Sequence, residues 1–462
     1  MTSILEFSTP IPATCENLFA WHTRPGAFDR LKPPWQQVEM PEPAPVTNGS
    51  RALLRLKKGP VWVSWLAEHR DVDEPDGFTD FQVRGPFARW THRHEFSANE
   101  AGGATLRDRI EYQLPGGALG HLIAGHSVVR DIEATFAYRH LTTARDLARH
   151  SRFSEAPSLR VAVTGASGLI GQSLLPFLST GGHRPMAVGR TGSGRPSAAA
   201  IRWTPDSGLL EPESIGPLDA LVHLAGENVA AGRWTRARKA AIYKSRVDGT
   251  RNLVRSLGRL QTPPKTLVCA SAIGYYGSRG DQELDEGSAS GDGFLAETVR
   301  DWEAAARAAE EYGIRVVLLR FGVVLTPSGG ALARLLTPFR LGGGGVIGSG
   351  RQTMSWVSID DAIGAIHAAL LDQSLAGPVN VVSPEPVTNR TFTKTLGRVL
   401  KRPTILPLPA AGARLLLGEM ADEMLLASAR VVPARLERAG FVFDDPSLGA
   451  ALERLLGATR LP

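Results

Sequence analysis

Three glycines with the spacing of a phosphate-binding turn lie between an apolar run and a helical pattern. The segment 159–171 reads L-R-V-A-V-T-G-A-S-G-L-I-G. In a strand, turn and helix of this kind, the first glycine permits the turn, the second lets the main chain approach a pyrophosphate, and the third allows close helix packing. The phosphates then lie at the positive N-terminus of the helix. The pattern predicts a dinucleotide site formed by Gly165, Ala166, Ser167, Gly168, Leu169, Ile170 and Gly171.

An arginine stands where the ribose of the dinucleotide would be recognised. A second strand is expected at 185–188, and Arg190 follows it at about the expected ~20 residues from the glycines. An acidic residue here would receive the ribose hydroxyls of NAD, whereas an arginine offers a charge-assisted fork to the 2′-phosphate of NADP. The alternative is a solvent-facing loop arginine, and Arg184 and Arg195 are secondary candidates. The sequence therefore predicts NADP, with NADPH preferred over NADH.

A later loop is expected to complete the cofactor site. The nearly continuous apolar run 218–225 is typical of a buried parallel strand. It ends in G-E-N, at the carboxyl edge where open α/β sheets bind cofactors. We expect cofactor contacts from Leu224, Ala225, Gly226, Glu227 and Arg246.

Strands and helices alternate through the region that holds these residues. Right-handed crossovers between such strands produce a doubly wound, Rossmann-like parallel sheet with helices on both faces. A small helical cap is expected to follow. We expect strands at 201–204, 266–270 and 315–320, helices at 235–257 and 297–312, and cap helices around 411–426 and 447–456.

Residues 1–150 carry no such glycine pattern. Strands followed by one long helix at about 129–150 predict an α+β domain in which an antiparallel sheet curls around a helix. A polar linker at 152–158 separates this block from the second domain, so the expected domains are 1–150, 158–403 and 404–462. The strands of the first block are expected at 4–8, 51–57, 61–70, 78–83, 90–96 and 105–112.

The first block resembles the START-like, polyketide-cyclase-type helix-grip domain. The resemblance lies in the order of its elements and in F-D-R-L-K-P-P-W after the first helix. It implies a cavity for an apolar ligand. Aromatic side chains either line that cavity or form ordinary core; they are Trp62, Trp65, Phe81, Phe87 and Trp90.

Histidines in the same block suggest metal binding at first sight. His92 and His94 share one strand face, and His121 and His126 follow. No Asp, Glu or Cys partner is fixed by the spacing, and metal sites normally combine such ligands. We therefore expect no metal site.

Composition narrows the class of protein. The chain has 462 residues, 43% of them hydrophobic and 21% charged, as in soluble globular α/β proteins. Its two cysteines, Cys15 and Cys269, lie in different expected domains, so we expect a reducing cytoplasm rather than a disulfide framework. No window approaches the apolar length of a membrane span. The net charge of +6 comes from scattered arginines, which favours solvated faces over nucleic-acid binding.

The region from 159 to the end is similar to a known family in many ordered motifs. That family is the NAD(P)-dependent epimerase family of extended or atypical short-chain dehydrogenase/reductases, which resembles nucleoside-diphosphate-sugar epimerases and is sometimes labelled a cell-division inhibitor. The resemblance implies a Rossmann fold with a small C-terminal domain. The motifs are T-G-A-S-G-L-I-G, H-L-A-G-E-N, S-A-I-G-Y-Y-G, F-L-A-E-x-x-x-D-W-E, L-R-F-G-V-V-L, G-S-G-R-Q-x-M-S-W-V-x-I-D-D and P-x-R-L-x-x-A-G-F.

The acid/base residues of short-chain dehydrogenases are only partly present. Those enzymes use a tyrosine with a lysine four residues later, and a nearby serine. Ser271 matches the serine, but no tyrosine of this chain has a lysine four positions on. The catalytic candidates are Ser271, Tyr275 and Tyr276. The substitutes left open are Glu297 as the acid/base, and Lys244, Arg246 or Arg279 as the cation.

Two functions compete at this point. The first is an NADP(H)-dependent oxidoreductase or epimerase-like protein that acts on a carbonyl or sugar-like small molecule, fused to a START-like ligand domain. The second is a protein that binds the cofactor without turnover, as a redox sensor or scaffold, which the missing Tyr/Lys pair permits.

Overall fold

The computed structural model describes residues 2–190, 201–209 and 215–459, except for the side chain of Arg190. The chain divides into two compact units. One consists of Met1–Ala156, Pro176–Gly182 and Glu453–Pro462, and the other of Pro157–Leu175 and His183–Leu452. Within the described ranges, no helix combines the length and the apolar character needed to cross a membrane.

A seven-stranded antiparallel sheet forms the first unit, in the order β1-β7-β6-β5-β4-β3-β2. Buried and exposed residues alternate along β6 and β7, because one face of each strand packs on a core. Each strand expected from the sequence is present. The strands are β1 (Ser3–Ile11), β2 (Val38–Glu39), β3 (Arg51–Lys58), β4 (Val61–Asp73), β5 (Gly77–Arg84), β6 (Arg89–Ala98) and β7 (Ala104–Gln113).

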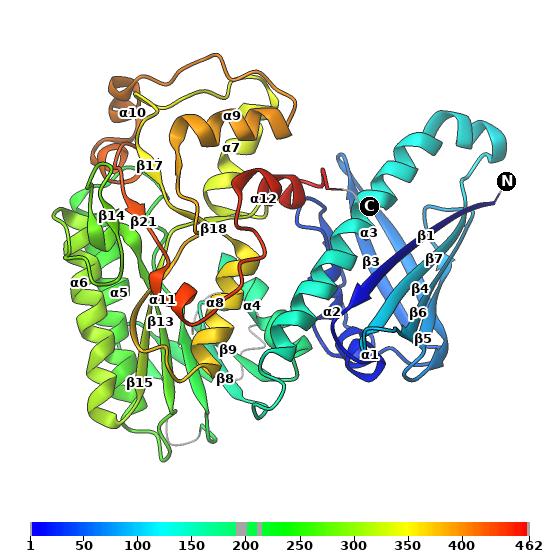
Figure 1. Cartoon of the computed structure of the whole chain (residues 1–462), viewed down its shortest axis with the longest axis horizontal. Coiled ribbons are helices and arrows are strands. Elements are labelled where there is room, and N and C mark those ends of the chain that lie inside the picture. Colours follow the sequence, from blue (N-terminus) through cyan, green and yellow to red (C-terminus); the bar gives the residue numbers. More distant parts are fainter. Residues whose placement is uncertain (1, 191–200, 210–214, 460–462) are drawn as a thin grey trace. The chain divides into compact units, whose positions relative to one another are not determined.

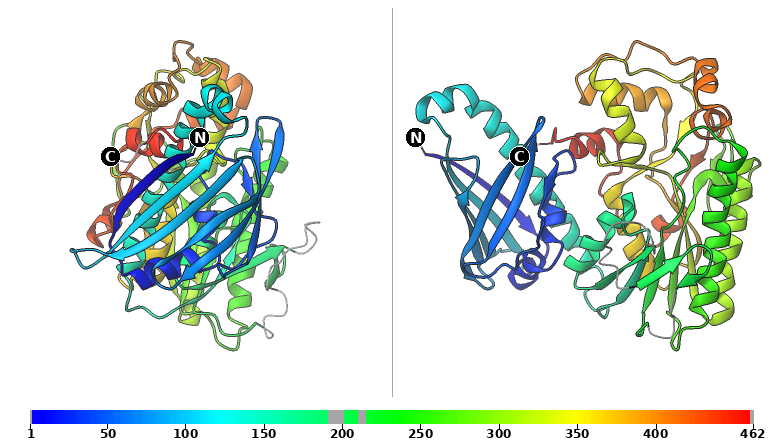
Figure 2. Two further views of the ribbon diagram at one scale, coloured as in Figure 1. Left: turned by 90° about the vertical axis from the view of Figure 1, so that its right-hand side faces the viewer. Right: turned by 180° about the vertical axis from the view of Figure 1, so that it is seen from behind.

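One long helix, α3 (Gly117–Ser151), packs along the buried face of this sheet (Figures 1 and 2). Ile132 and Phe136 of α3 share a core cluster with Ile110 and Tyr112 of β7. The helix begins about three turns before the expected start at 129. Its first turns contain several glycines, which lower helix propensity and hide the element in the sequence. Two short helices, α1 (Cys15–Thr23) and α2 (Ala27–Leu31), complete this part of the unit.

The second unit contains an eight-stranded sheet in the order β11-β10-β9-β8-β12-β13-β15-β19. All neighbouring pairs are parallel except β10 with β11. The chain runs outward from β8 to β9 and β10, then returns to β12 on the other side of β8. The strands are β8 (Arg160–Thr164), β9 (Arg184–Arg190), β10 (Ile201–Thr204), β11 (Gly208–Leu209), β12 (Ala220–His223), β13 (Thr266–Ala272), β15 (Arg315–Phe321) and β19 (Gly377–Val381).

Helices cover both faces of this sheet, as expected for a doubly wound fold. In Figure 1, α5 (Arg236–Leu257) and α6 (Phe294–Arg307) lie on one face and α8 (Ile359–Leu371) on the other. Leu253 and Trp302 of these helices share a core cluster with Leu221 and Leu318 of the strands. The sequence-based prediction of a Rossmann-like α/β fold is confirmed for this unit.

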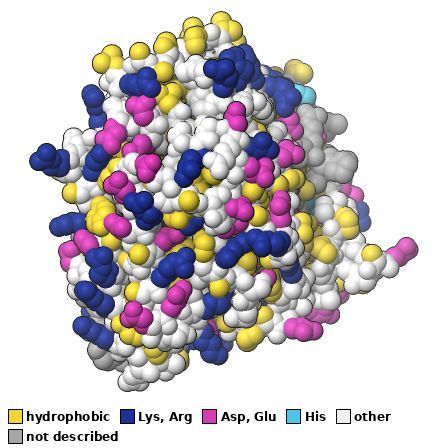
Figure 3. Space-filling model, turned by 60° about the vertical axis from the view of Figure 1, so that its left-hand side comes forward, with side chains coloured by type: hydrophobic (Ala, Val, Ile, Leu, Met, Phe, Trp, Pro, Cys, Tyr) yellow, Lys and Arg dark blue, Asp and Glu magenta, His cyan; other side chains and the backbone are white. Residues whose placement is uncertain are grey.

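The C-terminal segment holds the expected helical runs. Most of it belongs to the second unit, where the strand β21 (Arg430–Val431) pairs with β14 (Glu283–Leu284). On the face that Figure 3 shows, Lys and Arg side chains are interspersed with Asp and Glu. The helix α9 (Asn389–Val399) precedes this segment, whose helices are α10 (Ala410–Leu417), η4 (Ala421–Leu425), α11 (Ala434–Arg438) and α12 (Leu448–Leu455).

Candidate functional site

The glycine turn joins the end of β8 to α4 (Leu169–Thr180). It lies where the strand order reverses between β9 and β12. Gly165 has φ +67°, and a Cβ there would lie 2.7 Å from the carbonyl carbon of Leu224. A Cβ on Gly171 would lie 2.4 Å from the carbonyl oxygen of Gly165. Both positions require glycine, the first for its backbone conformation and both for space.

Gly168 leaves the outer side of the turn open. A Cβ there would meet Gly165 O at 3.0 Å and no other described atom within 4 Å, and Ser167 and Gly168 are exposed. Because α4 begins at Leu169, the amides of its first turn have no carbonyl one turn earlier to bind. An open turn at a positive helix terminus fits a pyrophosphate.

A buried hydrogen-bond chain fixes the loop after β12 against β8. Thr164 Oγ1 lies 2.7 Å from His223 Nδ1 and accepts a bond from the Leu224 amide at 3.2 Å. His223 Nε2 lies 3.0 Å from Thr250 Oγ1 on α5. Burial, with a smaller contribution from the Arg246 charge, lowers the pKa of His223 to about 4. The imidazole is therefore neutral near pH 7, and the loop residues Leu224 and Ala225 are held beside the glycine turn.

Arg246 of α5 lies beside the same loop. Its guanidinium donates to the Glu227 carbonyl oxygen at 2.9 Å, and a Cβ on Gly226 would lie 3.3 Å from the guanidinium carbon. The Glu227 amide donates to Ser245 Oγ at 3.0 Å. Burial lowers the pKa of Arg246 to about 10, so the group keeps its charge at neutral pH. The predicted residues Gly226, Glu227 and Arg246 are thus neighbours.

Arg190 is the residue that we expect to recognise the ribose 2′-phosphate of the cofactor. Arg190 is the last residue of β9, at the carboxyl end of the sheet, and its side chain is outside the described part of the chain. Arg184 starts the same strand and is paired in register with Arg160, so it lies at the opposite edge of the sheet. Arg195 is outside the described residues. Arg184 is therefore poorly placed to help Arg190 at one phosphate.

Ser271 belongs to a buried network that the sequence did not reveal. Its hydroxyl donates to Glu303 Oε1 at 2.6 Å. The same carboxylate receives two hydrogen bonds from Arg320, each 2.8 Å long. Ser271 of β13 and Arg320 of β15 are paired in register, and all three side chains are buried. The serine hydroxyl is thus held by protein groups.

Tyr276 is an interior member of this network. Its hydroxyl donates to Asn380 Oδ1 at 2.7 Å and accepts from Arg320 at 3.0 Å, and the side chain is fully buried. Burial raises the pKa of Tyr276 to about 12 even though Arg320 opposes the shift. A phenol with this pKa stays protonated near pH 7, which argues for a positioning role rather than proton transfer.

Tyr275 is placed differently. It is partly exposed, and the guanidinium carbon of Arg320 lies 3.5 Å from the centre of its ring. Within the described ranges, its hydroxyl has no hydrogen bond to the protein, so it is available to a ligand. Among the three catalytic candidates, Tyr275 is the one whose hydroxyl is not already committed to protein groups.

The candidate substitutes for the missing Tyr/Lys pair, Glu297 as the acid/base and Lys244 or Arg279 as the cation, lie elsewhere. Glu297 and Lys244 are exposed, and Arg279 donates to the carbonyl oxygens of Tyr276 and Ser290. The cation beside the tyrosines is instead Arg320. The sequence signals were the D-W-E and L-R-F-G motifs, which contain Glu303 and Arg320.

The five aromatic candidates of the first unit do not form one shared lining: Trp65, Phe87 and Trp90 belong to a core cluster, whereas Trp62 is exposed and Phe81 is partly exposed. Trp65, Phe87 and Trp90 contact one another, with ring centroids 4.7 to 5.5 Å apart. Trp62 lies under the side chains of Arg55 and Lys57. Phe81 is covered by Arg70, whose guanidinium carbon is 4.2 Å from the ring centre. The described residues therefore give no support for an apolar-ligand cavity built from these five side chains.

The histidines of that unit do have acidic partners. His92 and His94 lie on β6 between Asp80 of β5 and Asp108 of β7. The linear spacing showed no acidic partner for these histidines, and we therefore expected no metal site. The register of the neighbouring strands supplies two such partners, Asp80 and Asp108. His126 is exposed on α3, apart from this group.

A doubly wound sheet with a glycine turn at its switch point defines the second unit as a dinucleotide-binding Rossmann protein. Residues 161–382 match the NAD dependent epimerase/dehydratase family, and residues 408–455 match a domain of unknown function, DUF1731. The chain is 43% identical over 292 residues to an epimerase family protein of Mycobacterium bovis, covering 63% of this chain and 96% of that one. This chain belongs to the NAD dependent epimerase/dehydratase family.

Two solved structures extend the comparison. A structure described as the nucleoside-diphosphate sugar epimerase from Corynebacterium glutamicum has a TM-score of 0.80 and 33% identity, and the match covers 99% of this chain and 91% of that chain. The human epimerase family protein SDR39U1, solved with NADPH, has a TM-score of 0.59 and 36% identity, covering 64% of this chain and 99% of the human one. The first match includes both units of the present chain.

Proposed function

We propose that the second unit binds NADPH and is an oxidoreductase or epimerase-like enzyme for a carbonyl or sugar-like small molecule. The observation that carries the proposal is the position of Tyr275. Its available hydroxyl follows β13, two strands from the glycine turn after β8, at the same edge of the sheet. The human relative solved with NADPH supports the choice of cofactor.

The residues for holding the cofactor come from three segments. The open turn at Gly168 and the first turn of α4 would receive the pyrophosphate, and the loop at Gly226 with Arg246 would border it. Arg190, at the end of β9, would bind the 2′-phosphate. When bound, the nicotinamide supplies hydride donor or acceptor chemistry.

The remaining chemistry falls to the chain's own side chains. We assign the acid/base role to Tyr275, because its hydroxyl can reach a ligand while its ring is fixed against Arg320. Ser271 and Tyr276 hold Glu303 and Arg320 in place through buried hydrogen bonds. The stacked Arg320 supplies the fixed cation that a lysine supplies in the usual Tyr-x-x-x-Lys arrangement.

The test combines binding with turnover. Calorimetric titration with NADPH would be followed by two screens: aldehydes and ketones for NADPH oxidation, and nucleotide sugars with NADP⁺ for the epimerised product, because epimerisation returns the hydride and consumes no cofactor. With a substrate in hand, Tyr275→Phe should preserve NADPH affinity and lower turnover by about 100-fold or more, the scale of a lost acid/base. Tyr312→Phe, at an exposed tyrosine, is the matched control and should keep wild-type turnover. Normal turnover in Tyr275→Phe would remove the assignment.

A second function is a cofactor-binding sensor or scaffold without turnover. Two observations favour it. The hydroxyls of Ser271 and Tyr276 are both hydrogen-bonded to protein groups, and no lysine lies four residues after Tyr275 or Tyr276. Tight NADPH binding with no turnover on the whole panel would support this function over the first.

We also infer that the first unit is a START-like helix-grip domain. The support is its antiparallel sheet with one long C-terminal helix packed on the buried face. We further infer a reducing cytoplasm as the compartment, because Cys15 and Cys269 are both free. Tryptophan fluorescence of the chain titrated with apolar ligands tests the domain's ligand class, and an unchanged spectrum would count against an apolar ligand.

A further inference from the structure

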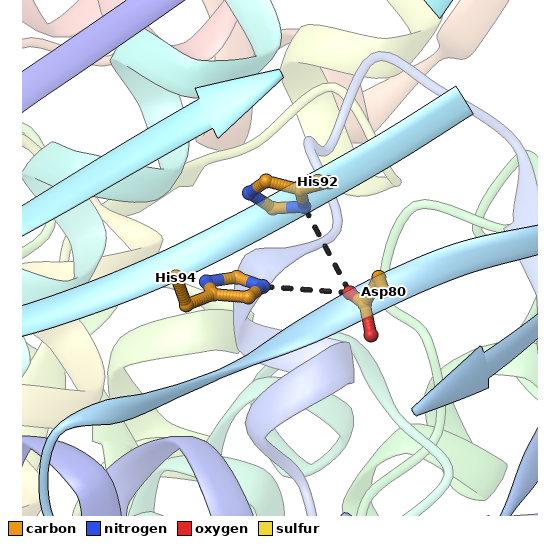
Figure 4. A group of neighbouring side chains, drawn as sticks. All are labelled: Asp80, His92 and His94. Atoms are coloured by element: carbon orange, nitrogen blue, oxygen red, sulfur yellow. Dashed lines mark hydrogen bonds and ion pairs between the residues drawn. The ribbon is translucent and has the colours of Figure 1, made fainter. Parts of the chain in front are cut away.

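A row of histidine and aspartate side chains crosses the first unit from strand to strand. The register pairs His69 of β4 with Asp80 of β5, Asp80 with His92 of β6, and His94 of β6 with Asp108 of β7. Alternation places these side chains on one face of the sheet, because each pairing joins residues that point the same way. Figure 4 shows His92 and His94 directed toward Asp80.

We propose that Asp80, His92 and His94 bind a single divalent transition-metal ion inside the first unit. Imidazole nitrogens with a carboxylate oxygen are a ligand set for Zn²⁺ or Fe²⁺. Three protein ligands also leave a position for water or another ligand, as in catalytic zinc sites. The proposal does not depend on the function of the second unit.

The ligand atoms have the separations that such an ion needs. Asp80 Oδ2 lies 3.8 Å from His92 Nδ1 and 3.4 Å from His94 Nε2, and the three atoms lie within 4.8 Å of one another. Metal–ligand bonds of ~2.0–2.2 Å in tetrahedral geometry put ligand atoms about 3.3–3.6 Å apart. Small side-chain rotations would therefore complete the site. The same separations are long for charge-assisted hydrogen bonds, which are ~2.7–2.9 Å.

The opposite side of each imidazole faces the buried carboxylate of Asp108. His92 Nε2 is hydrogen-bonded to Asp108 Oδ1 at 3.0 Å. His94 Nδ1 is buried 2.9 Å from the same oxygen, without the geometry of a hydrogen bond. Metal-binding histidines commonly donate their other ring nitrogen to a carboxylate, which fixes ring orientation. Asp108 thus fixes the ring of His92 by a hydrogen bond and lies beside the ring of His94, while His92 Nδ1 and His94 Nε2 face Asp80.

Further contacts fix the two carboxylates. His69 Nδ1 lies 2.6 Å from Asp80 Oδ1, so the other carboxylate oxygen, Oδ2, is left for the ion. His140 of α3 lies 2.9 Å from the second oxygen of Asp108. The charge of Arg139 attracts both carboxylates, Asp80 and Asp108. Its guanidinium donates a hydrogen bond to the Leu31 carbonyl oxygen at 3.2 Å. The Asp80 side chain is 27% exposed, which gives an ion access to an otherwise buried group.

The experiment uses the full chain with any purification tag removed and bound metal stripped with EDTA. Zn²⁺ is titrated by calorimetry, Co²⁺ by visible absorption, and Fe²⁺ under anaerobic conditions. We expect one tight ion per chain, with a Co²⁺ spectrum of nitrogen and oxygen ligation. Asp80→Asn and His94→Gln should each weaken Zn²⁺ binding by about 100-fold or more, and Asp108→Asn by about 10- to 100-fold. His126→Gln removes an exposed histidine and should bind Zn²⁺ like the wild type.

Circular dichroism and NADPH titration of each variant show whether both units remain folded. Zn²⁺ should also raise the melting temperature of the wild type but not that of folded Asp80→Asn. The proposal is overturned if the stripped wild type binds none of the three ions, or if folded Asp80→Asn and His94→Gln bind Zn²⁺ as tightly as His126→Gln does.

Discussion

The guanidinium of Arg320 stacks on Tyr275, with its central carbon 3.5 Å from the ring centre. The same group makes two hydrogen bonds with Glu303. One buried cation therefore connects an interior carboxylate to a tyrosine that is partly exposed at the edge of the sheet. This relationship gives Tyr275 a fixed neighbour that no local sequence motif supplies.

We expect Arg320→Met to destabilise the second unit by about 3–5 kcal/mol, because it leaves the buried Glu303 charge without its partner. Adding Glu303→Gln should recover part of that loss, since the uncompensated charge is removed. The exposed pair of Arg251 with Asp248 provides a control, and Arg251→Met should cost less than ~1 kcal/mol. Urea denaturation checks these values, and equal effects at both arginines would contradict the argument.

The stability of the second unit should fall between about pH 6.5 and pH 4 because of His223. Its pKa is about 4 in the folded chain and near 6.5 when unfolded, so the unfolded state binds the additional proton within this window. The loss should approach about 3 kcal/mol at the acid end. Urea midpoints across this range should therefore fall more steeply for the wild type than for His223→Asn, which cannot titrate. Parallel curves for the two proteins would rule out this contribution.

Cofactor choice should depend on Arg190. Loss of charge-assisted hydrogen bonds worth ~1.5–3 kcal/mol predicts that Arg190→Ala weakens NADPH binding by about one to two orders of magnitude, with little change for NADH. Arg184→Ala alters the opposite end of the same strand and should leave both affinities unchanged. Calorimetry with both cofactors is the measurement. A wild type that prefers NADH would contradict the prediction.

Limited proteolysis should cut the chain near Arg152. This residue is the C-cap of α3, which ends at Ser151, and a largely exposed segment follows before β8 begins at Arg160. The sheet and the long helix of the first unit lie before the cut, and only the short segments Pro176–Gly182 and Glu453–Pro462 of that unit lie after it. We therefore expect both fragments to remain folded. Mass spectrometry and circular dichroism of the separated fragments test this. A cut that leaves neither fragment folded would mean that the two parts are one interdigitated domain.

The sequence by itself determined the glycine turn and the strands that were expected, although not the full length of α3. Gly165 and Gly171 are dictated locally, because the turn needs a left-handed residue and a helix packed against main chain. The apolar runs of β8, β12, β13 and β15 predict buried parallel strands, since both faces of such a sheet are covered. Hydrophobic periodicity and the placement of glycines are local properties. They can therefore be read from the sequence before the fold is known.

Only the tertiary structure decided which polar side chains meet. Arg320 and Glu303 come from a strand and a helix, and nothing in their spacing shows that they join Ser271. His92 and His94 were visible as a pair, but Asp80 reaches them through the register of neighbouring strands. Register follows from the packing of whole strands, because a shift of one residue reverses which face each side chain occupies. Partnerships across strands are therefore fixed by the folded sheet.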